Sequence, residues 1–168
     1  FPRDELFQIE AERLHEWSEG ILDLETRPRV RVFARPDRFD RFVSVLVYVP
    51  RDRYNSSARE HIGALLADAY KGRIAAFYPY FTDGPLVRVQ FIVGRYEGTT
   101  PQVEAAELER GIRQLLRTWA DRLADAVRTL GPRGDALLEK YGAAFSAGYA
   151  ETFTSERAQQ GISAGSER

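Results

Sequence analysis

The chain has 168 residues, and its 24 lysines and arginines nearly balance 25 aspartates and glutamates, for a formal net charge of −1. This length suits one domain with helical attachments, and a charge near zero provides no general attraction to nucleic acid or to an anionic membrane surface. The absence of cysteine excludes disulfides, cysteine-ligated zinc and a thiol nucleophile, and it suits a reducing cytoplasm.

The sequence shows no membrane or export signal. No apolar run approaches the roughly 20 residues of a membrane-spanning helix, and no signal peptide opens the chain. The chain begins at Phe1 and contains no methionine. We therefore expect a cytoplasmic piece of a longer protein, without a membrane partner.

The first predicted element is a helix that begins near Glu10. Residues 1–9 show no periodicity. Pro28 ends the helix, because proline lacks a donor and disfavours helical geometry in the residue before it. Residues 1–28 are thus expected to form an N-terminal helical extension. Its buried stripe consists of apolar residues at helical spacing, namely Leu14, Trp17, Ile21 and Leu24.

A hairpin and a helix are predicted next. Residues 29–35 and 41–50 alternate with strand period, and valine occupies every second position from 43 to 49. The short link between the two runs indicates an antiparallel pair. A helix then begins at residues 55–57, where Ser57 and Glu60 have capping-box spacing, and Gly72 suits its end.

A second pair of strands and further helices are predicted in the rest of the chain. Residues 73–81 and 86–96 are predicted strands around a turn at 82–85. A helix beginning at Thr100 and Pro101 keeps its apolar period for about thirty residues. After a break, a shorter helix begins at Asp135, and the small, polar tail from Gly161 is expected to be mobile.

This order of elements predicts an α+β fold. Four antiparallel strands with two helices on one face form a ferredoxin-like domain, here in a permuted ββαββα order, over residues 29–131. The strand at 29–35 would occupy the edge that the last strand takes in the usual order. Residues 132–168 are expected to form a C-terminal helical segment with the mobile tail.

One face of this sheet is predicted to be open. If the valines face the two helices, a mixed polar and apolar set faces away, and such a surface favours packing against another domain or subunit. The alternative is ordinary scatter of apolar residues on a surface. The predicted interface residues are Ser44, Leu46, Tyr48, Leu86, Arg88, Gln90 and Ile92.

The sequence contains no pattern that indicates catalysis. His15 and His61 lie on separate predicted helices without metal-ligand spacing, and no GxGxxG or GxxxxGK[ST] motif is present. Glu104, Glu107 and Glu109 are expected on a solvated helix face. We expect no catalytic, cofactor-binding or metal-binding residue in this chain.

An RNA-binding sheet is an alternative suggested by arginine content. RNA-binding sheets stack bases on aromatics of central strands, and the predicted open face offers only Tyr48 there. The arginines are better interpreted as a solvated edge strand and as partners of Asp37, Asp40 and Asp52. The arginines concerned are Arg27, Arg29, Arg31, Arg35, Arg38, Arg41, Arg51 and Arg53.

An aromatic run at residues 77–81, FYPYF, must place half of its rings outside the core. Packing on a helix together with an inter-domain contact is the favoured interpretation, and a ligand pocket is the alternative.

Three strings resemble a known family: FPRDELFQI, RVRVFARPDRFDRFVSVLVYVPRDRYN, and AFYPYF followed by VRVQFIVGR. They are similar to the long non-catalytic N-terminal region of the large bacterial NAD-specific glutamate dehydrogenases. The resemblance implies an ACT-like regulatory or scaffolding module that docks onto neighbouring domains of a homo-oligomer. The whole enzyme converts glutamate and NAD to 2-oxoglutarate, ammonium and NADH, with NAD bound outside this segment.

The resemblance also implies the main alternative, an amino-acid effector-sensing ACT domain, ahead of the RNA-binding sheet. Such domains bind amino acids, commonly with a glycine in the first strand–helix loop, and the loop at 50–57 has none. Two guanidiniums and a helix N-terminus could still hold a carboxylate there, although the same residues could simply shape the loop. The candidate effector residues are Arg51, Asp52, Arg53, Tyr54 and Asn55.

Overall fold

The computed structural model describes residues 2–96, 98–117 and 121. All described helices and strands lie within one compact unit, Phe1–Leu116. Their order is α1 (Arg3–Leu6), α2 (Ala11–Thr26), β1 (Arg31–Pro36), β2 (Phe42–Pro50), a 3-10 turn η1 (Arg51–Arg53), α3 (Ser56–Ala69), β3 (Gly72–Phe81), β4 (Leu86–Arg95) and α4 (Ala105–Leu115).

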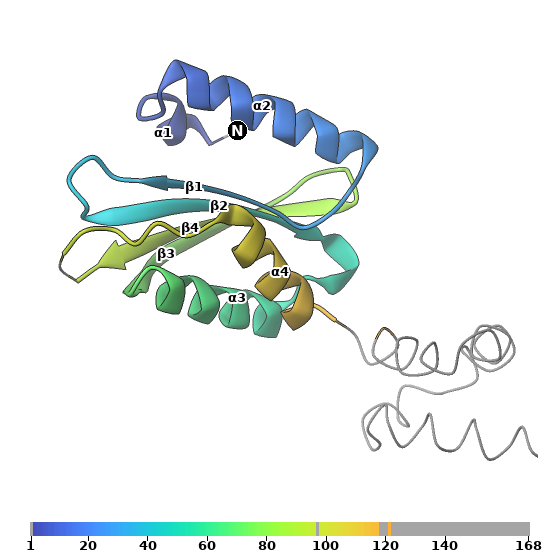
Figure 1. Ribbon diagram of the computed structural model, residues 1–168. Coiled ribbons are helices and arrows are strands. Elements are labelled where there is room, and N and C mark those ends of the chain that lie inside the picture. Colours follow the sequence, from blue (N-terminus) through green and yellow to red (C-terminus); the bar gives the residue numbers. More distant parts are fainter. Residues whose placement is uncertain (1, 97, 118–120, 122–168) are drawn as a thin grey trace, which may run out of the picture. The chain divides into compact units, whose positions relative to one another are not determined.

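The four strands form one antiparallel sheet in the order β1-β2-β4-β3 (Figure 1). Since β2 and β3 are both antiparallel to β4, they run parallel to each other, and α3 connects them across one face of the sheet. β1 pairs with β2 at the outer edge, the position of the last strand in the usual ferredoxin-like order. The predicted permuted α+β fold is confirmed.

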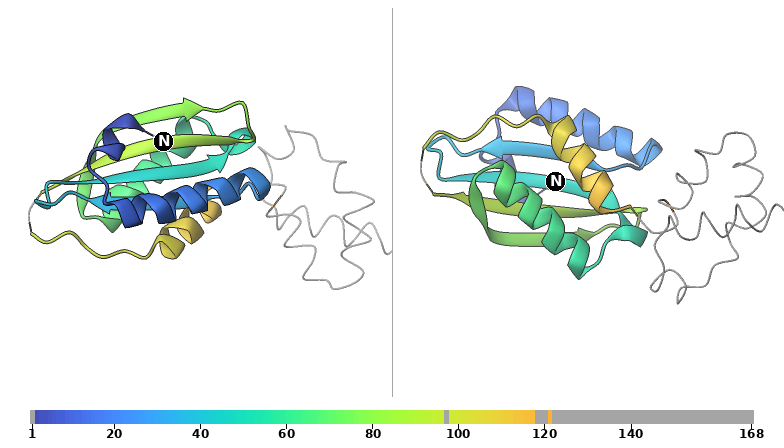
Figure 2. Two further views of the ribbon diagram at one scale, coloured as in Figure 1. Left: turned by 90° about the horizontal axis from the view of Figure 1, so that it is seen from above. Right: turned by 60° about the horizontal axis from the view of Figure 1, so that its bottom comes forward.

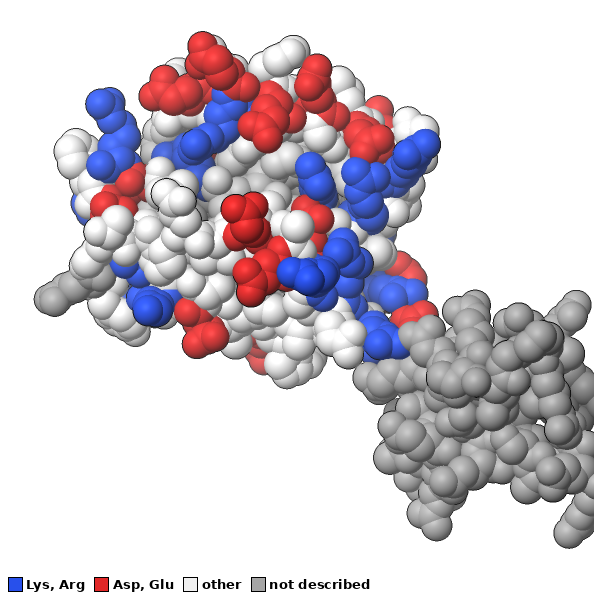
Figure 3. Space-filling view, viewed as in Figure 1, with Lys and Arg blue, Asp and Glu red and all other residues white. Residues whose placement is uncertain are grey.

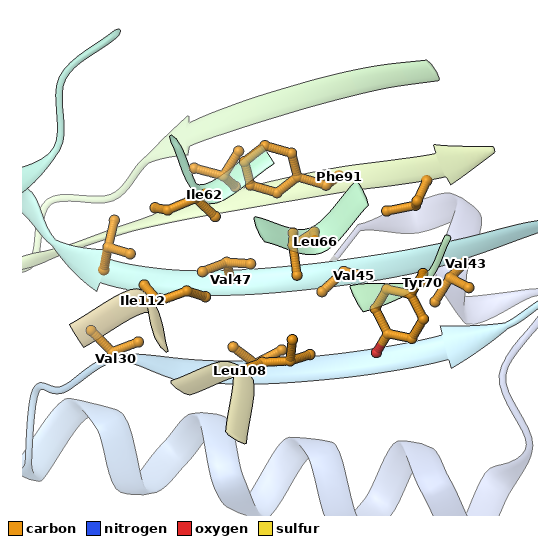
Figure 4. Packing of buried hydrophobic residues seen from close by; sticks show 14 of the residues in the cluster. Val30, Val43, Val45, Val47, Ile62, Leu66, Tyr70, Phe91, Leu108 and Ile112 are labelled. Carbon is orange, nitrogen blue, oxygen red and sulfur yellow. The ribbon is translucent and has the colours of Figure 1, made fainter. Parts of the chain in front are cut away.

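The main core lies between the sheet and the two helices α3 and α4 (Figure 4). The alternating valines of β2 point into it, as the strand period predicts, because successive side chains point to opposite faces. Phe91 of β4 packs there beside Ile62 and Leu66 of α3, and α4 contributes Leu108 and Ile112.

The opposite face of the sheet is covered by the chain itself. α1 and α2 lie on this face, and α2 runs along the β1 side (Figures 1 and 2). On β3, Tyr78 and Tyr80 remain 60% and 54% exposed. The sequence predicted an open face, but most of it is a second core. This second core contains Trp17, Leu24, Phe33, Leu46, Tyr48 and Leu86.

The edge of β1 is closed by a side chain from α4. Glu109 is buried, and its Oε1 accepts a hydrogen bond from the Val32 backbone N–H at 3.2 Å. Arg31 Nη1 lies 3.4 Å from the same oxygen. The predicted solvated position of Glu109 is therefore wrong. Its carboxylate satisfies an edge donor that would otherwise be free to pair with another strand.

Two details of the α3 termini differ from the prediction. Asn55 is the N-cap, and its Oδ1 accepts a hydrogen bond from the Ala58 N–H at 2.8 Å, so the predicted Ser57–Glu60 capping box does not form. At the other end, Lys71 rather than Gly72 adopts a positive φ of 48°. Gly72 already belongs to β3.

The helix predicted from Thr100 begins later and ends sooner than expected. α4 spans Ala105–Leu115. The Thr100 N–H donates to Asp40 Oδ1 at 3.0 Å, which ties Thr100 to the β1–β2 turn instead of to a helix. The rest of the predicted long helix and the C-terminal segment from Asp135 lie outside the described residues.

Candidate functional site

A buried polar network fastens α1 to the outer face of the sheet. Arg35 donates to both carboxylate oxygens of Glu5, at 2.8 and 3.2 Å, and to Gln8 Oε1 at 3.0 Å. Gln90 Nε2 donates to Glu5 Oε1 at 3.2 Å and to Ser44 Oγ at 3.0 Å. Glu5 and Arg35 are only 3% and 5% exposed. The predicted solvated position of Arg35 is wrong, since Glu5 pairs with it in the interior.

The predicted interface residues divide into three groups. Ser44 and Gln90 belong to the network with Glu5, while Leu46, Tyr48 and Leu86 lie against α2 in the second core. Here the packing partner of the mixed face is the chain's own N-terminal helices. Arg88 and Ile92, further along β4, are only partly buried.

Aromatic rings line the junction between α2 and the sheet. The Phe33 ring lies 5.4 Å from Trp17 and 6.0 Å from Tyr48, the latter edge to face. Burial raises the pKa of Tyr48, although the Arg88 cation nearby opposes that shift. Tyr48 is thus neutral at physiological pH and part of the interior, not a free stacking platform.

The predicted effector loop is held by its own chain. The Arg51 N–H donates to the Pro85 carbonyl at 2.9 Å, and Arg51 Nη1 donates to the Thr82 carbonyl at 3.1 Å. The Tyr54 ring meets Phe81 edge to face at 5.8 Å. Asn55 caps α3, whereas Asp52 is exposed and lies 3.9 Å from Arg53. Binding of a carboxylate at this loop stays a prediction.

Surface grooves border the sheet in the part of the chain that the structure describes, among them the following three. The first, of about 440 Å³, lies between the C-terminal half of α2 and the β3–β4 turn and includes Tyr48, Tyr80 and Arg88. The second, of about 310 Å³, lies between α3 and β3 over Gly63. The third, of about 300 Å³, lies where the α1–α2 link meets the β1–β2 turn, between Phe7 and Phe39.

The aromatic run of β3 lies at these grooves. Phe77 borders the second groove and Tyr80 the first. Three rings of this run each have an arginine guanidinium close to the ring face. The distances to the ring centres are 4.4 Å for Arg59 and Phe77, 4.6 Å for Arg88 and Tyr80, and 5.9 Å for Arg51 and Phe81. Such cation–π contacts hold guanidiniums in place at a solvent-facing edge.

The exposed Phe7 and Phe39 were missed at the sequence level. Phe7 falls in the non-periodic start and Phe39 in a turn, so neither belongs to a pattern that reveals its exposure. Phe7 is 89% and Phe39 is 73% exposed. Apolar rings in two unrelated loops are signals only when the fold brings them to the same groove.

The surface charge distribution opposes the RNA-binding alternative. Acidic side chains crowd the surface over α2 (Figure 3). They lie above the very face on which bases would have to stack, and that face is filled by the second core. The exposed carboxylates of α2 are Glu12, Glu16, Glu19, Asp23 and Glu25.

Within the described ranges, no three histidine, cysteine or carboxylate side chains gather in a way that could hold a metal ion. Among the helices described, none is both long and apolar enough to cross a membrane.

Family models divide the chain into three consecutive segments. The model described as the ACT2 domain of glutamate dehydrogenase matches residues 31–120. The models for its helical motifs 1 and 2 match residues 1–27 and 127–160. The ACT2 segment thus contains the whole sheet with α3 and α4, and helical motif 1 contains α1 and α2.

Curated relatives give the same assignment. The chain is 37% identical to the NAD-specific glutamate dehydrogenase of Halomonas elongata over 94% of its own length. The corresponding proteins of Pseudomonas aeruginosa and Mycobacterium tuberculosis are 34% and 35% identical over 90% and 91% of this chain. The chain spans 10% of the length of each relative. It belongs to the NAD-specific glutamate dehydrogenase family and corresponds to the ACT2 domain and flanking helical motifs of the N-terminal region.

Proposed function

We propose that this chain is a non-catalytic scaffolding and regulatory module of an NAD-specific glutamate dehydrogenase, which docks onto neighbouring domains or subunits of a homo-oligomer. In this proposal the whole enzyme oxidises glutamate to 2-oxoglutarate and ammonium with NAD, and NAD binds outside this chain. The names of the relatives and the ACT2 match support the parent enzyme.

The docking role is carried by one observation, the pair of exposed rings at the third groove. Phe7 and Phe39, from the α1–α2 and β1–β2 connections, border the same groove and are both largely exposed. Exposed apolar area costs about 25 cal/mol per Å² relative to burial, so covering both rings would stabilise a contact. Arg38 and Glu10 at the same groove supply polar groups for the rim of such an interface.

The effector-sensing alternative has less support. A sensor at the predicted loop would need free guanidiniums, whereas the Arg51 guanidinium donates a hydrogen bond to the Thr82 carbonyl and lies near the Phe81 ring. We therefore favour docking over amino-acid sensing at Arg51–Asn55.

Two experiments test the proposal. Purified chain mixed with glutamate and NAD should form no NADH above the rate without protein, and turnover would overturn the non-catalytic assignment.

In the full-length enzyme, the Phe7→Ser and Phe39→Ser double variant should weaken subunit assembly or lower specific activity, measured by analytical ultracentrifugation and steady-state assays. Leu22→Ser is the matched control, since Leu22 is exposed on α2 away from this groove. Equal behaviour of the double variant and the control would contradict the docking role of these rings.

A further inference from the structure

The groove beside α2 combines apolar walls with one cation, and we define it as the α2 groove. It lies between the C-terminal half of α2, the outer face of β2 and β4, and the β3–β4 turn. Its volume of about 440 Å³ falls within the range of roughly 300–1,000 Å³ that is typical of small-molecule sites. The side chains that the argument uses are Ile21, Leu24, Tyr48, Tyr80, Leu86 and Arg88.

Arg88 is held at the centre of a row of side chains across three strands. In the sheet register Tyr48 and Tyr80 are its direct neighbours on β2 and β3. The guanidinium lies 4.6 Å from the centre of the Tyr80 ring. This cation–π contact favours the position of the guanidinium in the groove.

This guanidinium has no carboxylate partner among the residues that the structure describes. Other arginines have one, for example Arg35 with Glu5 and Arg41 with Asp37. The Nε of Arg88 is buried without a hydrogen-bond acceptor, and the polar neighbour of the guanidinium is the hydroxyl of Tyr48, which is neutral. A partly buried cation in an apolar groove is costly unless an anion is paired with it. The groove therefore holds a positive charge that attracts a complementary group.

The other side chains of the groove define which chemical features its ligand must have. Leu24, Leu86 and the two tyrosine rings offer apolar contact around Arg88. Glu25 also lines the groove and is exposed. A second negative charge on the ligand would be repelled by Glu25, whereas a neutral apolar body would not.

We propose that the α2 groove binds a small monocarboxylate with an apolar, ring-sized body. The carboxylate pairs with the terminal nitrogens of Arg88, and the body packs between Tyr80 and the Leu24–Leu86 wall. Such a charge-assisted pair is stronger than a neutral hydrogen bond, and the apolar walls reduce its screening by water. All the residues named for this site belong to this chain.

The test compares an acid with its neutral isostere on the unmodified chain. 3-Phenylpropionate should bind in isothermal titration calorimetry and shift NMR resonances of Tyr80 and Leu86, while 3-phenylpropionamide should bind roughly tenfold or more weakly, the loss expected for one charge-assisted bond. Phenylsuccinate, which carries a second carboxylate, should also bind more weakly. Equal binding of the acid and the amide, or no binding of the acid at millimolar concentration, would overturn the proposal.

Two variants locate the site. Arg88→Gln should reduce affinity for the acid to that of the amide, and Arg73→Gln is the matched control, since Arg73 is an exposed arginine of β3 that does not line the groove. Glu25→Gln should reduce the discrimination against phenylsuccinate. Unchanged affinity in a folded Arg88→Gln protein would rule out this groove. If that variant fails to fold, the comparison of acid and amide still decides whether a carboxylate is recognised.

Discussion

At the scale of single residues, the Glu5–Arg35 pair has the largest expected effect on stability. Glu5→Ala leaves Arg35 buried opposite an empty position, and loss of one partner of a buried ion pair costs about 3–5 kcal/mol. Chemical denaturation of the variant and of the parent chain measures this difference. Replacing both residues with apolar ones, as in Glu5→Leu with Arg35→Met, should recover much of the stability, because no charge is then left unpaired.

The control for this pair is an arginine–carboxylate contact on the surface. Asp23 Oδ2 and Arg29 Nη2 lie 2.6 Å apart, but both side chains are about 40% exposed. Asp23→Ala should therefore cost less than about 1 kcal/mol. If Glu5→Ala also cost less than about 1 kcal/mol of stability, the contact between α1 and the sheet would contribute little to the fold.

Tyr70 gives the chain a dependence of stability on alkaline pH. Burial in the main core raises the pKa of Tyr70 to about 12, whereas tyrosine in an unfolded chain titrates near pH 10. Between about pH 10 and 12 the folded state keeps a proton that the unfolded state loses, so stability falls as pH rises through this window. Below about pH 10 the effect is absent.

Tyr70→Phe tests this assignment. The variant should lose less stability than the parent chain between about pH 10 and 12, in denaturation curves recorded at several pH values. Some slope should remain, since burial also raises the pKa of Tyr48 and of Tyr54. Tyr96→Phe is the control at an exposed position. Identical slopes for Tyr70→Phe and the parent chain would contradict the buried position of this hydroxyl.

At the scale of elements, the sequence predicted what depends on local periodicity. The valines of β2, and Trp17 and Leu24 of the α2 stripe, were assigned correctly because each pattern repeats within one element. The burial of Leu46 and Tyr48 under α2 was not predictable in this way. A mixed face accepts an intramolecular helix or a separate partner equally well, and only the tertiary arrangement decides between them.

The errors at element ends have a similar origin. Asn55, Ser56 and Ser57 are all good N-cap residues, so composition alone could not select Asn55. Thr100 followed by Pro101 has the chemistry of a helix start, but a long-range hydrogen bond to Asp40 holds Thr100 in the loop. The candidate grooves depend still more on such distant contacts, since Tyr48, Arg88 and α2 meet only in the folded chain.

The start of β3 requires glycine because two backbones meet there. A Cβ at Gly72 would lie 2.3 Å from the Gly94 carbonyl oxygen on β4, which is a backbone atom that cannot rotate away. Gly72→Ala should therefore lower the free energy of unfolding by about 3 kcal/mol, because β3 and β4 must either move apart at this point or keep a strained contact. Thermal and urea unfolding measure the loss.

Gly84→Ala provides the matched control for this substitution. Gly84 lies in the β3–β4 turn, and a Cβ there would meet only Thr82 Oγ1, at 3.5 Å. This variant should stay within about 0.5 kcal/mol of the parent chain. Equal stability of the two variants would mean that the β3–β4 pair adjusts its spacing freely at Gly72.

At the scale of the whole molecule, the N-terminal helices and the sheet belong to one compact unit although family models divide them. Helical motif 1 ends at residue 27 and the ACT2 segment begins at residue 31. The second core nevertheless joins Trp17 and Leu24 of the first segment to Phe33, Leu46 and Leu86 of the second. The sheet carries an apolar surface on both sides and requires cover on each.

A chain shortened to begin at Arg29 tests this dependence. It keeps the main core between the sheet, α3 and α4, so its circular dichroism should retain strand and helix signals. It also exposes the apolar side of β1 and β2, and large exposed apolar patches promote association. We therefore expect a lower melting temperature, binding of the dye ANS, and concentration-dependent self-association in analytical ultracentrifugation.

Trp17→Ser in the full chain should shift the melting temperature in the same direction, whereas Leu22→Ser on the exposed side of α2 should not. A shortened chain that stays monomeric, with an unchanged melting temperature, would instead make α1 and α2 an independent attachment, and the mixed face of the sheet would again be available to another domain.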